Sequence, residues 1–131
     1  MPAILITRRP PVRAARLHRP HAIESAPQLT MTVSRTAETI SIAFVGELDL
    51  AVETEVAELV ESVVTQEGVT ALHIDATRVT FCGSSGLRSL ILAREAALGH
   101  QLTFALDNTD PGPVQRLVTL FGLSGLWSMI S

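Results

Sequence analysis

The stretch Val79-Thr80-Phe81-Cys82-Gly83-Ser84-Ser85-Gly86-Leu87 decides how this chain folds, because it reads as a strand that leads through a short loop into a helix. Ser84 and Ser85 are good N-cap residues, since a hydroxyl accepts hydrogen bonds from the free N–H groups of a first helical turn. Gly83 and Gly86 bracket the two serines and let the backbone turn tightly. The stretch therefore predicts two hydroxyls presented at the start of a helix.

The two serines support two interpretations. Both hydroxyls are expected at the positive end of the helix dipole, a place that tolerates added negative charge. Ser84 or Ser85 is then a candidate phosphate acceptor, whereas in the simpler interpretation both serines only cap the helix. The helix itself is predicted to bury an apolar stripe made of Leu87, Leu90, Ile91 and Leu98.

Length and composition indicate one domain with a single core. The chain has 131 residues and one cysteine, Cys82, which rules out an internal disulfide and a multi-cysteine metal site. No apolar run is long enough to cross a bilayer, and no secretory signal is recognisable. These features predict a cytoplasmic protein without a cofactor.

Charge is divided unevenly along the chain. Residues 1–27 hold five arginines against Glu24, a net charge of +4, and residues 28–131 hold five arginines against twelve acids, a net charge of −7. Nucleic acid is not indicated as a partner of the acidic part, because phosphate contacts need clustered positive charge. A basic partner surface fits it better.

Residues 1–27 are predicted to be a disordered tail rich in arginine and proline, followed by a folded domain over residues 28–131. Five prolines interrupt the tail and it lacks periodicity. An inert tail is the favoured interpretation. The alternatives are binding to anionic lipid or nucleic acid through charge, and a translation start at Met31.

Hydrophobic periodicity predicts an α/β domain with the order β-β-α-β-α-β-α-β. The elements are strands over 29–35 and 39–45 that form a hairpin, a helix over 50–66, a strand over 71–76, a helix after residue 83, a strand over 102–106, a helix after Asp110, and a short strand or a turn that packs on the core over 126–130. Strands that alternate with helices imply a mixed, mostly parallel sheet covered by helices.

The helix over 50–66 carries the clearest pattern. One apolar stripe at helical spacing consists of Val52, Val56, Leu59, Val60 and Val63. Asp49 precedes the helix as a capping carboxylate. The remaining faces hold glutamates, which are either a solvated surface or a docking surface for a basic partner.

Enzyme signatures are missing. A nucleophile elbow would need glycine at Leu87, and no histidine follows with an acid in the required order. Neither glycine-rich phosphate motif occurs, and the histidines lack metal-ligand spacing. Cys82 is expected to pack in the core, and His73 is expected to pack at a strand position. The chain is therefore predicted not to be an enzyme.

Several motifs in this order resemble the STAS domain of bacterial anti-sigma factor antagonists. They are Gly46-Glu47-Leu48-Asp49, Asp75 on its apolar strand, Val79-Thr80-Phe81, Ser84-Ser85-Gly86-Leu87, Val114-Gln115-Arg116-Leu117 and Gly122-Leu123. The resemblance covers residues 29–130. It implies an anti-sigma factor antagonist that binds an anti-sigma factor, itself a serine kinase of the histidine-kinase-like ATPase type, and frees a sigma factor by partner switching.

The resemblance also implies which residues do this. The family's phosphorylated serine aligns with Ser84, and a phosphatase would reverse the modification. The partner-binding residues would be Glu47, Asp49, Gly83, Ser84, Ser85, Gly86, Leu87 and Arg88. Gly83 departs from the family, which has an aspartate there that helps to orient the hydroxyl.

Two further expectations follow from the resemblance. The family often adds a C-terminal helix that this chain lacks, which leaves an apolar flank for a partner or for a second copy in a homodimer. Because Gly83 replaces the aspartate, the alternative function is a STAS module that no longer switches and serves as a scaffold or a small-ligand sensor.

Overall fold

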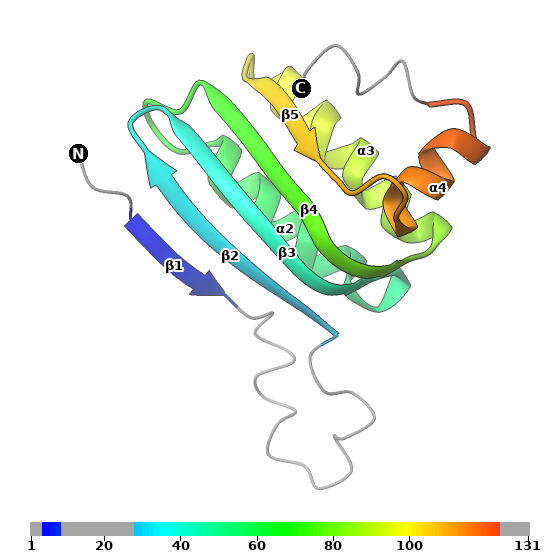
Figure 1. Ribbon diagram of the computed structural model, residues 1–131. Helices are drawn as coiled ribbons and strands as arrows, with labels where there is room; N and C mark the ends of the chain where they lie inside the picture. Colours follow the sequence, from blue (N-terminus) through cyan, green and yellow to red (C-terminus); the bar gives the residue numbers. More distant parts are fainter. Residues whose placement is uncertain (1–3, 9–27, 124–131) are drawn as a thin grey trace, which may run out of the picture.

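The computed structural model describes residues 4–8 and 28–123, which form one sheet and its helices (Figure 1). The elements in chain order are β1 (Ile4–Arg8), β2 (Leu29–Thr36), β3 (Thr39–Leu48), the 3₁₀ helix η2 (Leu50–Val52), α2 (Glu53–Val64), β4 (Ala71–Cys82), α3 (Ser84–Gly99), β5 (Thr103–Asp107) and α4 (Pro113–Leu120). The predicted strand over 126–130 lies outside the described residues.

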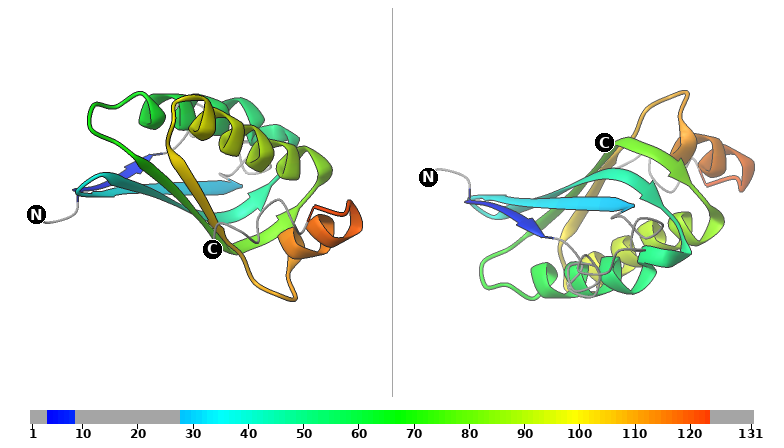
Figure 2. Two further views of the ribbon diagram at one scale, coloured as in Figure 1. Left: turned by 90° about the horizontal axis from the view of Figure 1, so that it is seen from above. Right: turned by 90° about the horizontal axis from the view of Figure 1, so that it is seen from below.

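The five strands form a single sheet in the order β1-β2-β3-β4-β5. β2 and β3 pair as the predicted antiparallel hairpin, and the pairs β3–β4 and β4–β5 are parallel. α2 and α3 lie side by side on one face of the sheet, and α4 packs against β4 (Figures 1 and 2). The prediction of an α/β domain with a mixed sheet entered through a hairpin is confirmed.

β1 corrects the prediction that residues 1–27 lack ordered structure. Ile4–Arg8 pairs antiparallel with β2, with Ile4 opposite Arg35 and Arg8 opposite Met31. The run Ile-Leu-Ile-Thr has high strand propensity and ends before Pro10, but the arginines and prolines further along dominate the composition of the segment. Residues 9–27 lie outside the described part of the chain.

Alternating strand residues meet the helices in one core. The buried face of the sheet consists of Leu29, Met31, Val33, Ile40, Ile42, Phe44, Leu72, Ile74, Phe104 and Leu106. On α2 the predicted stripe is confirmed, since Val56, Leu59, Val60 and Val63 are all nearly inaccessible to solvent. The amphipathic pattern of α2 therefore packs the helix on the sheet.

The stripe predicted for α3 is only partly right. Leu87 and Leu90 are buried and Ile91 is partly buried, but Leu98 is 45% exposed. Ala93 and Ala97 occupy the core-facing positions of the later turns instead. Small side chains there bring α3 close to the rest of the core, and Leu98, in the last turn, turns away from it.

Ser89, on α3, is the one buried polar residue of the described core, with 4% of its surface exposed. Its Oγ has no hydrogen-bond partner among the described residues. A buried hydroxyl without a partner costs roughly 1–3 kcal/mol in desolvation. We expect Ser89→Ala to raise the free energy of unfolding by about 1 kcal/mol in urea melts. A destabilised variant would show that the hydroxyl has a partner in solution.

Candidate partner-binding site

Two motifs that are distant in sequence meet where β3 and β4 end. Glu47 lies opposite Phe81 in the parallel ladder, and Leu48 lies opposite Cys82. The Gly83 N–H then donates a hydrogen bond to the Leu48 carbonyl at 3.1 Å. This pairing places the Gly-Glu-Leu-Asp motif beside the loop that opens α3.

Gly46 allows β3 to follow this path. Its φ is +122°, in a region that favours glycine, and a Cβ there would collide with the backbone oxygen of Gln28. The ladder with β4 shifts register between Gly46 and Glu47, as at a β-bulge. After the shift, β3 ends with Glu47 exposed, and the chain continues into Asp49.

Asp49 caps the turn that follows β3, as predicted. Its Oδ1 accepts a hydrogen bond from the Ala51 N–H at 3.1 Å, and it is the N-cap of η2. A Cβ built on Gly83 would lie 3.8 Å from the Asp49 Cβ. The Asp49 side chain therefore lies next to the N-terminus of α3.

Ser84 is the first residue of α3 and is exposed. The prediction that the serines are the N-cap is wrong, because Gly83 holds that position with an extended backbone, and no side chain of the described residues caps the helix. Ser85 is half-buried. The exposed Ser84 hydroxyl therefore stands at a helix N-terminus whose free N–H groups favour an anion.

Gly86 and Leu87 pack the first turn of α3 against the end of β3 and the core. A Cβ on Gly86 would collide with the Leu48 carbonyl oxygen and lie 3.1 Å from the Cys82 Sγ. Leu87 is 3% exposed and belongs to the core. Both residues are among the predicted partner-binding residues, and in the structure both are buried, where they fix the approach of α3 to β3.

Arg88 lies on the outer surface one turn into α3. Its Nη1 is 3.1 Å from the Glu53 Oε2, and its side chain is 68% exposed. Pairs this exposed contribute at most about 1 kcal/mol to stability. The ion pair therefore links the first turns of α2 and α3 and leaves Arg88 accessible.

Two exposed apolar residues at this end were not predicted. Phe81 is 46% exposed and its ring lies 3.6 Å from the position of a Gly83 Cβ, and Leu50, directly after Asp49, is 70% exposed. The outward direction of Phe81 was readable from the strand, since Cys82 beside it faces the core. We call Glu47, Asp49, Leu50, Phe81, Ser84, Ser85 and Arg88 together the Ser84 surface.

Gly83 has room for the aspartate that the resemblance to the STAS domain implies at this position. Its φ is −87°, and the nearest atoms to an added Cβ are at 3.6–3.8 Å, which is ordinary contact. An aspartate at an N-cap accepts from free N–H groups of the first turn. We expect Gly83→Asp to raise the free energy of unfolding by a few tenths to about 1 kcal/mol in urea, with repulsion from Asp49 limiting the gain. A loss above about 1 kcal/mol would contradict this geometry.

Cys82, at the end of β4, is buried as predicted. Burial raises the pKa of its thiol to about 11, so the thiol stays protonated near neutral pH. Among the described residues no group of three or more side chains could hold a metal ion. No helix in the described ranges is long and apolar enough to cross a membrane.

A second polar cluster lies on the sheet face opposite α2 and α3, and sequence reasoning missed it. His73 Nδ1 lies 3.4 Å from the Ser41 Oγ, and its Nε2 lies 2.9 Å from the Asp107 Oδ2. A serine, a histidine and an aspartate in contact could suggest a catalytic triad, which also needs an oxyanion hole of free backbone N–H groups. Ser41 is in the middle of β3, which is paired with strands on both sides, so the nearby N–H groups are used in the sheet. The cluster therefore joins β3, β4 and β5 as a cross-strand contact.

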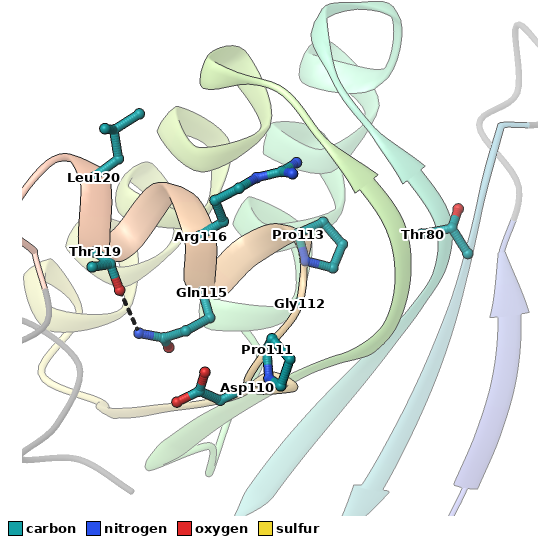
Figure 3. Close-up of a pocket in the computed structure, with 9 residues that line it drawn as sticks. All are labelled: Thr80, Asp110, Pro111, Gly112, Pro113, Gln115, Arg116, Thr119 and Leu120. Atoms are coloured by element: carbon teal, nitrogen blue, oxygen red, sulfur yellow. Dashed lines mark hydrogen bonds between the residues drawn. The ribbon is translucent and has the colours of Figure 1, made fainter.

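A groove of about 820 Å³ lies between Thr80 and α4 (Figure 3). It is open, and one wall is formed by Gln115 and Thr119, which share a 3.0 Å hydrogen bond drawn in Figure 3. None of the site residues predicted from the sequence lines this groove. The groove and the Ser84 surface share no residue, although Thr80 of the groove directly precedes Phe81 of the Ser84 surface.

The chain is similar to known proteins in sequence and in fold. A family model described as "Mlab, STAS domain" matches residues 31–130. The crystal structure of an anti-sigma factor antagonist from Mycobacterium paratuberculosis is similar with a TM-score of 0.66 and 25% identity, over 76% of this chain and 82% of that chain.

The anti-sigma factor antagonist SpoIIAA in its unphosphorylated form is similar with a TM-score of 0.61 and 21% identity, over 72% of this chain and 83% of that chain. At that identity the likeness shows the fold alone. A search of curated proteins found no match.

Proposed function

Because this chain belongs to the STAS domain family, we propose that it is an anti-sigma factor antagonist that binds an anti-sigma factor through the Ser84 surface. The observation that carries the proposal is the exposed Ser84 hydroxyl at the start of α3, beside the turn capped by Asp49. The structural likeness to an anti-sigma factor antagonist at 25% identity supports the same role. The chain would act by binding in the cytoplasm rather than by catalysis.

The chemistry of the Ser84 surface fits a protein partner. Exposed Phe81 and Leu50 offer apolar contact area, and Arg88 offers a charged rim. Interfaces commonly combine an apolar centre with a polar edge. The proposed partner is an anti-sigma factor that is also a serine kinase of the histidine-kinase-like ATPase type, and its capture would free a sigma factor.

Phosphorylation of Ser84 is the proposed control. A phosphoserine adds roughly −1.5 to −2 charges at pH 7. The N-terminus of α3 tolerates that charge, so the fold would persist, while Asp49 and Glu47 nearby would strengthen the negative field. A partner surface fitted to the neutral hydroxyl would then dissociate, and a phosphatase would restore binding.

The direct experiment is a pull-down from native cytosol with partner identification by mass spectrometry, using wild type, Ser84→Ala, Ser84→Asp and a Ser62→Asp control. Ser62 is exposed on α2, near the far end of the helix pair. We expect an anti-sigma factor with wild type, Ser84→Ala and Ser62→Asp, and at least about tenfold less with Ser84→Asp. Equal recovery with Ser84→Asp would remove Ser84 from the interface.

Gly83 favours a second candidate function, a STAS module that no longer switches and serves as a scaffold or small-ligand sensor. The observation is the missing carboxylate beside Ser84, at a position where the structure has room for one. Phosphorylation of wild type and Gly83→Asp by the recovered kinase separates the two functions. If only Gly83→Asp is modified, the chain binds without switching, whereas equal rates favour the switching antagonist.

A further inference from the structure

A crevice of about 160 Å³ runs between α2 and α3 on the surface of the helix layer. The two helices point the same way, because Glu53 meets Arg88 near both starts and Glu61 meets His100 near both ends. Figure 2 shows the pair side by side over the sheet. The crevice thus lies between two parallel helices, and Glu53 in its lining pairs with Arg88 of the Ser84 surface.

The floor of the crevice is apolar with one unsatisfied polar atom. Val56 and Val60 line it from α2, and Ala93 lines it from α3. Ser89 also lines it, is 4% exposed, and its Oγ has no hydrogen-bond partner in the described structure. Native proteins rarely leave a buried hydroxyl without a hydrogen-bond partner. The unpaired Ser89 Oγ therefore suggests that a bound group occupies the crevice.

Charge at the crevice has one sign. Among the described residues that line it, Glu53 and Glu61 are the charged ones. The Arg88 Nη1 lies 3.1 Å from the Glu53 Oε2, whereas the Glu61 Oε2 has the His100 Nε2 at 3.9 Å. α2 carries four glutamates and no basic residue, and residues 28–123 hold twelve acids against five arginines. An occupant with a positive charge is therefore favoured.

Size decides between a metabolite and a side chain. Pockets for small-molecule ligands usually span about 300–1,000 Å³, which is well above 160 Å³. One long side chain fits the smaller volume. Lysine and arginine combine an apolar stem with a cationic head, and they bury the stem while the head stays at the surface.

We propose that the crevice between α2 and α3 receives a lysine or arginine side chain of a protein partner. The stem packs on Val56, Val60 and Ala93, and the head binds a rim carboxylate, with Glu61 the more available one. An N–H group of the same partner donates to the Ser89 Oγ. This inference does not depend on the Ser84 surface and gives the glutamate-rich α2 a binding role.

The test is an amide NMR titration of the full chain with n-butylguanidinium, compared with 1-butanol as a neutral probe of similar length. We expect saturable shifts at Ser89, Ala93 and Val60 with the cation, and at least about threefold weaker binding for 1-butanol. Glu61→Gln should weaken cation binding by a similar factor, and the matched control Glu67→Gln, outside the crevice, should not. Equal binding of both probes, or no saturable shift at Ser89 and Ala93, would overturn the proposal.

A second titration separates a protein partner from a free small cation. The probe is an amphipathic helical peptide with one arginine on its apolar face. We expect it to shift the same amides with at least about tenfold higher affinity than n-butylguanidinium, because it adds contact area around the arginine. Ser89→Ala should weaken the peptide without unfolding the chain. A peptide that binds no tighter than the small cation would overturn the proposal.

Discussion

Gly86→Ala is expected to lose about 2–4 kcal/mol of the free energy of unfolding. A Cβ at this position collides with the carbonyl oxygen of Leu48 and presses on the Cys82 Sγ. The obstacle is backbone at the end of β3, which cannot rotate away as a side chain could. α3 must therefore move off the sheet, and the Ser84 surface moves with it. Urea melts of the variant measure this loss directly.

Gly99→Ala is the matched control in the same helix. Among the described residues, no atom beyond the adjoining helix backbone lies within 4 Å of an added Cβ at Gly99, and alanine is the better helix former. We expect this variant to be unchanged or more stable by up to about 1 kcal/mol. If Gly86→Ala were as stable as Gly99→Ala, α3 would not pack on the end of β3 as described.

Leu59→Ala is expected to cost about 2–5 kcal/mol. Leu59 is 3% exposed in the middle of α2, where its side chain belongs to the core cluster under the helix layer. Truncation removes apolar contacts and leaves a cavity that close-packed neighbours fill only in part. The variant should also shift the thermal midpoint downward in parallel with the urea midpoint.

Glu58→Ala, at the neighbouring exposed position, controls for changes in helix propensity. Substitutions at such positions usually stay within about 0.5 kcal/mol of wild type. A Leu59→Ala loss below about 1 kcal/mol would mean that the stripe of α2 does not face the sheet. That result would contradict both the periodicity of the sequence and the structure.

Most of the fold could be predicted from local hydrophobic patterns in the sequence. The alternation in β2 and β3 and the stripe of α2 need only neighbouring residues, so Ile42, Phe44 and Leu59 were predicted correctly. β1 was missed because a five-residue strand was averaged with the arginines and prolines that follow it. Leu98 was misplaced because periodicity states which side chains share a face, while the length of the sheet decides how far the core extends.

The sequence motifs predicted which residues form the candidate site, but not which of them are exposed. The motifs located Ser84 and Asp49, and pairing of β3 with β4 brings them together. Whether a residue is exposed or buried depends on packing between elements, so the motif alone does not indicate that Leu87 is buried. The crevice at Ser89 depends on two helices that are distant in sequence, and no local pattern indicates it.

The most direct measurement of the central claim is release of the sigma factor. The anti-sigma factor recovered by pull-down is purified in complex with its sigma factor, and free sigma factor is followed by size-exclusion chromatography as this chain is added. We expect wild type and Ser84→Ala to release it and Ser84→Asp to need at least about tenfold more protein. The account would be contradicted if wild type in excess released none, or if Ser84→Asp released as much as wild type.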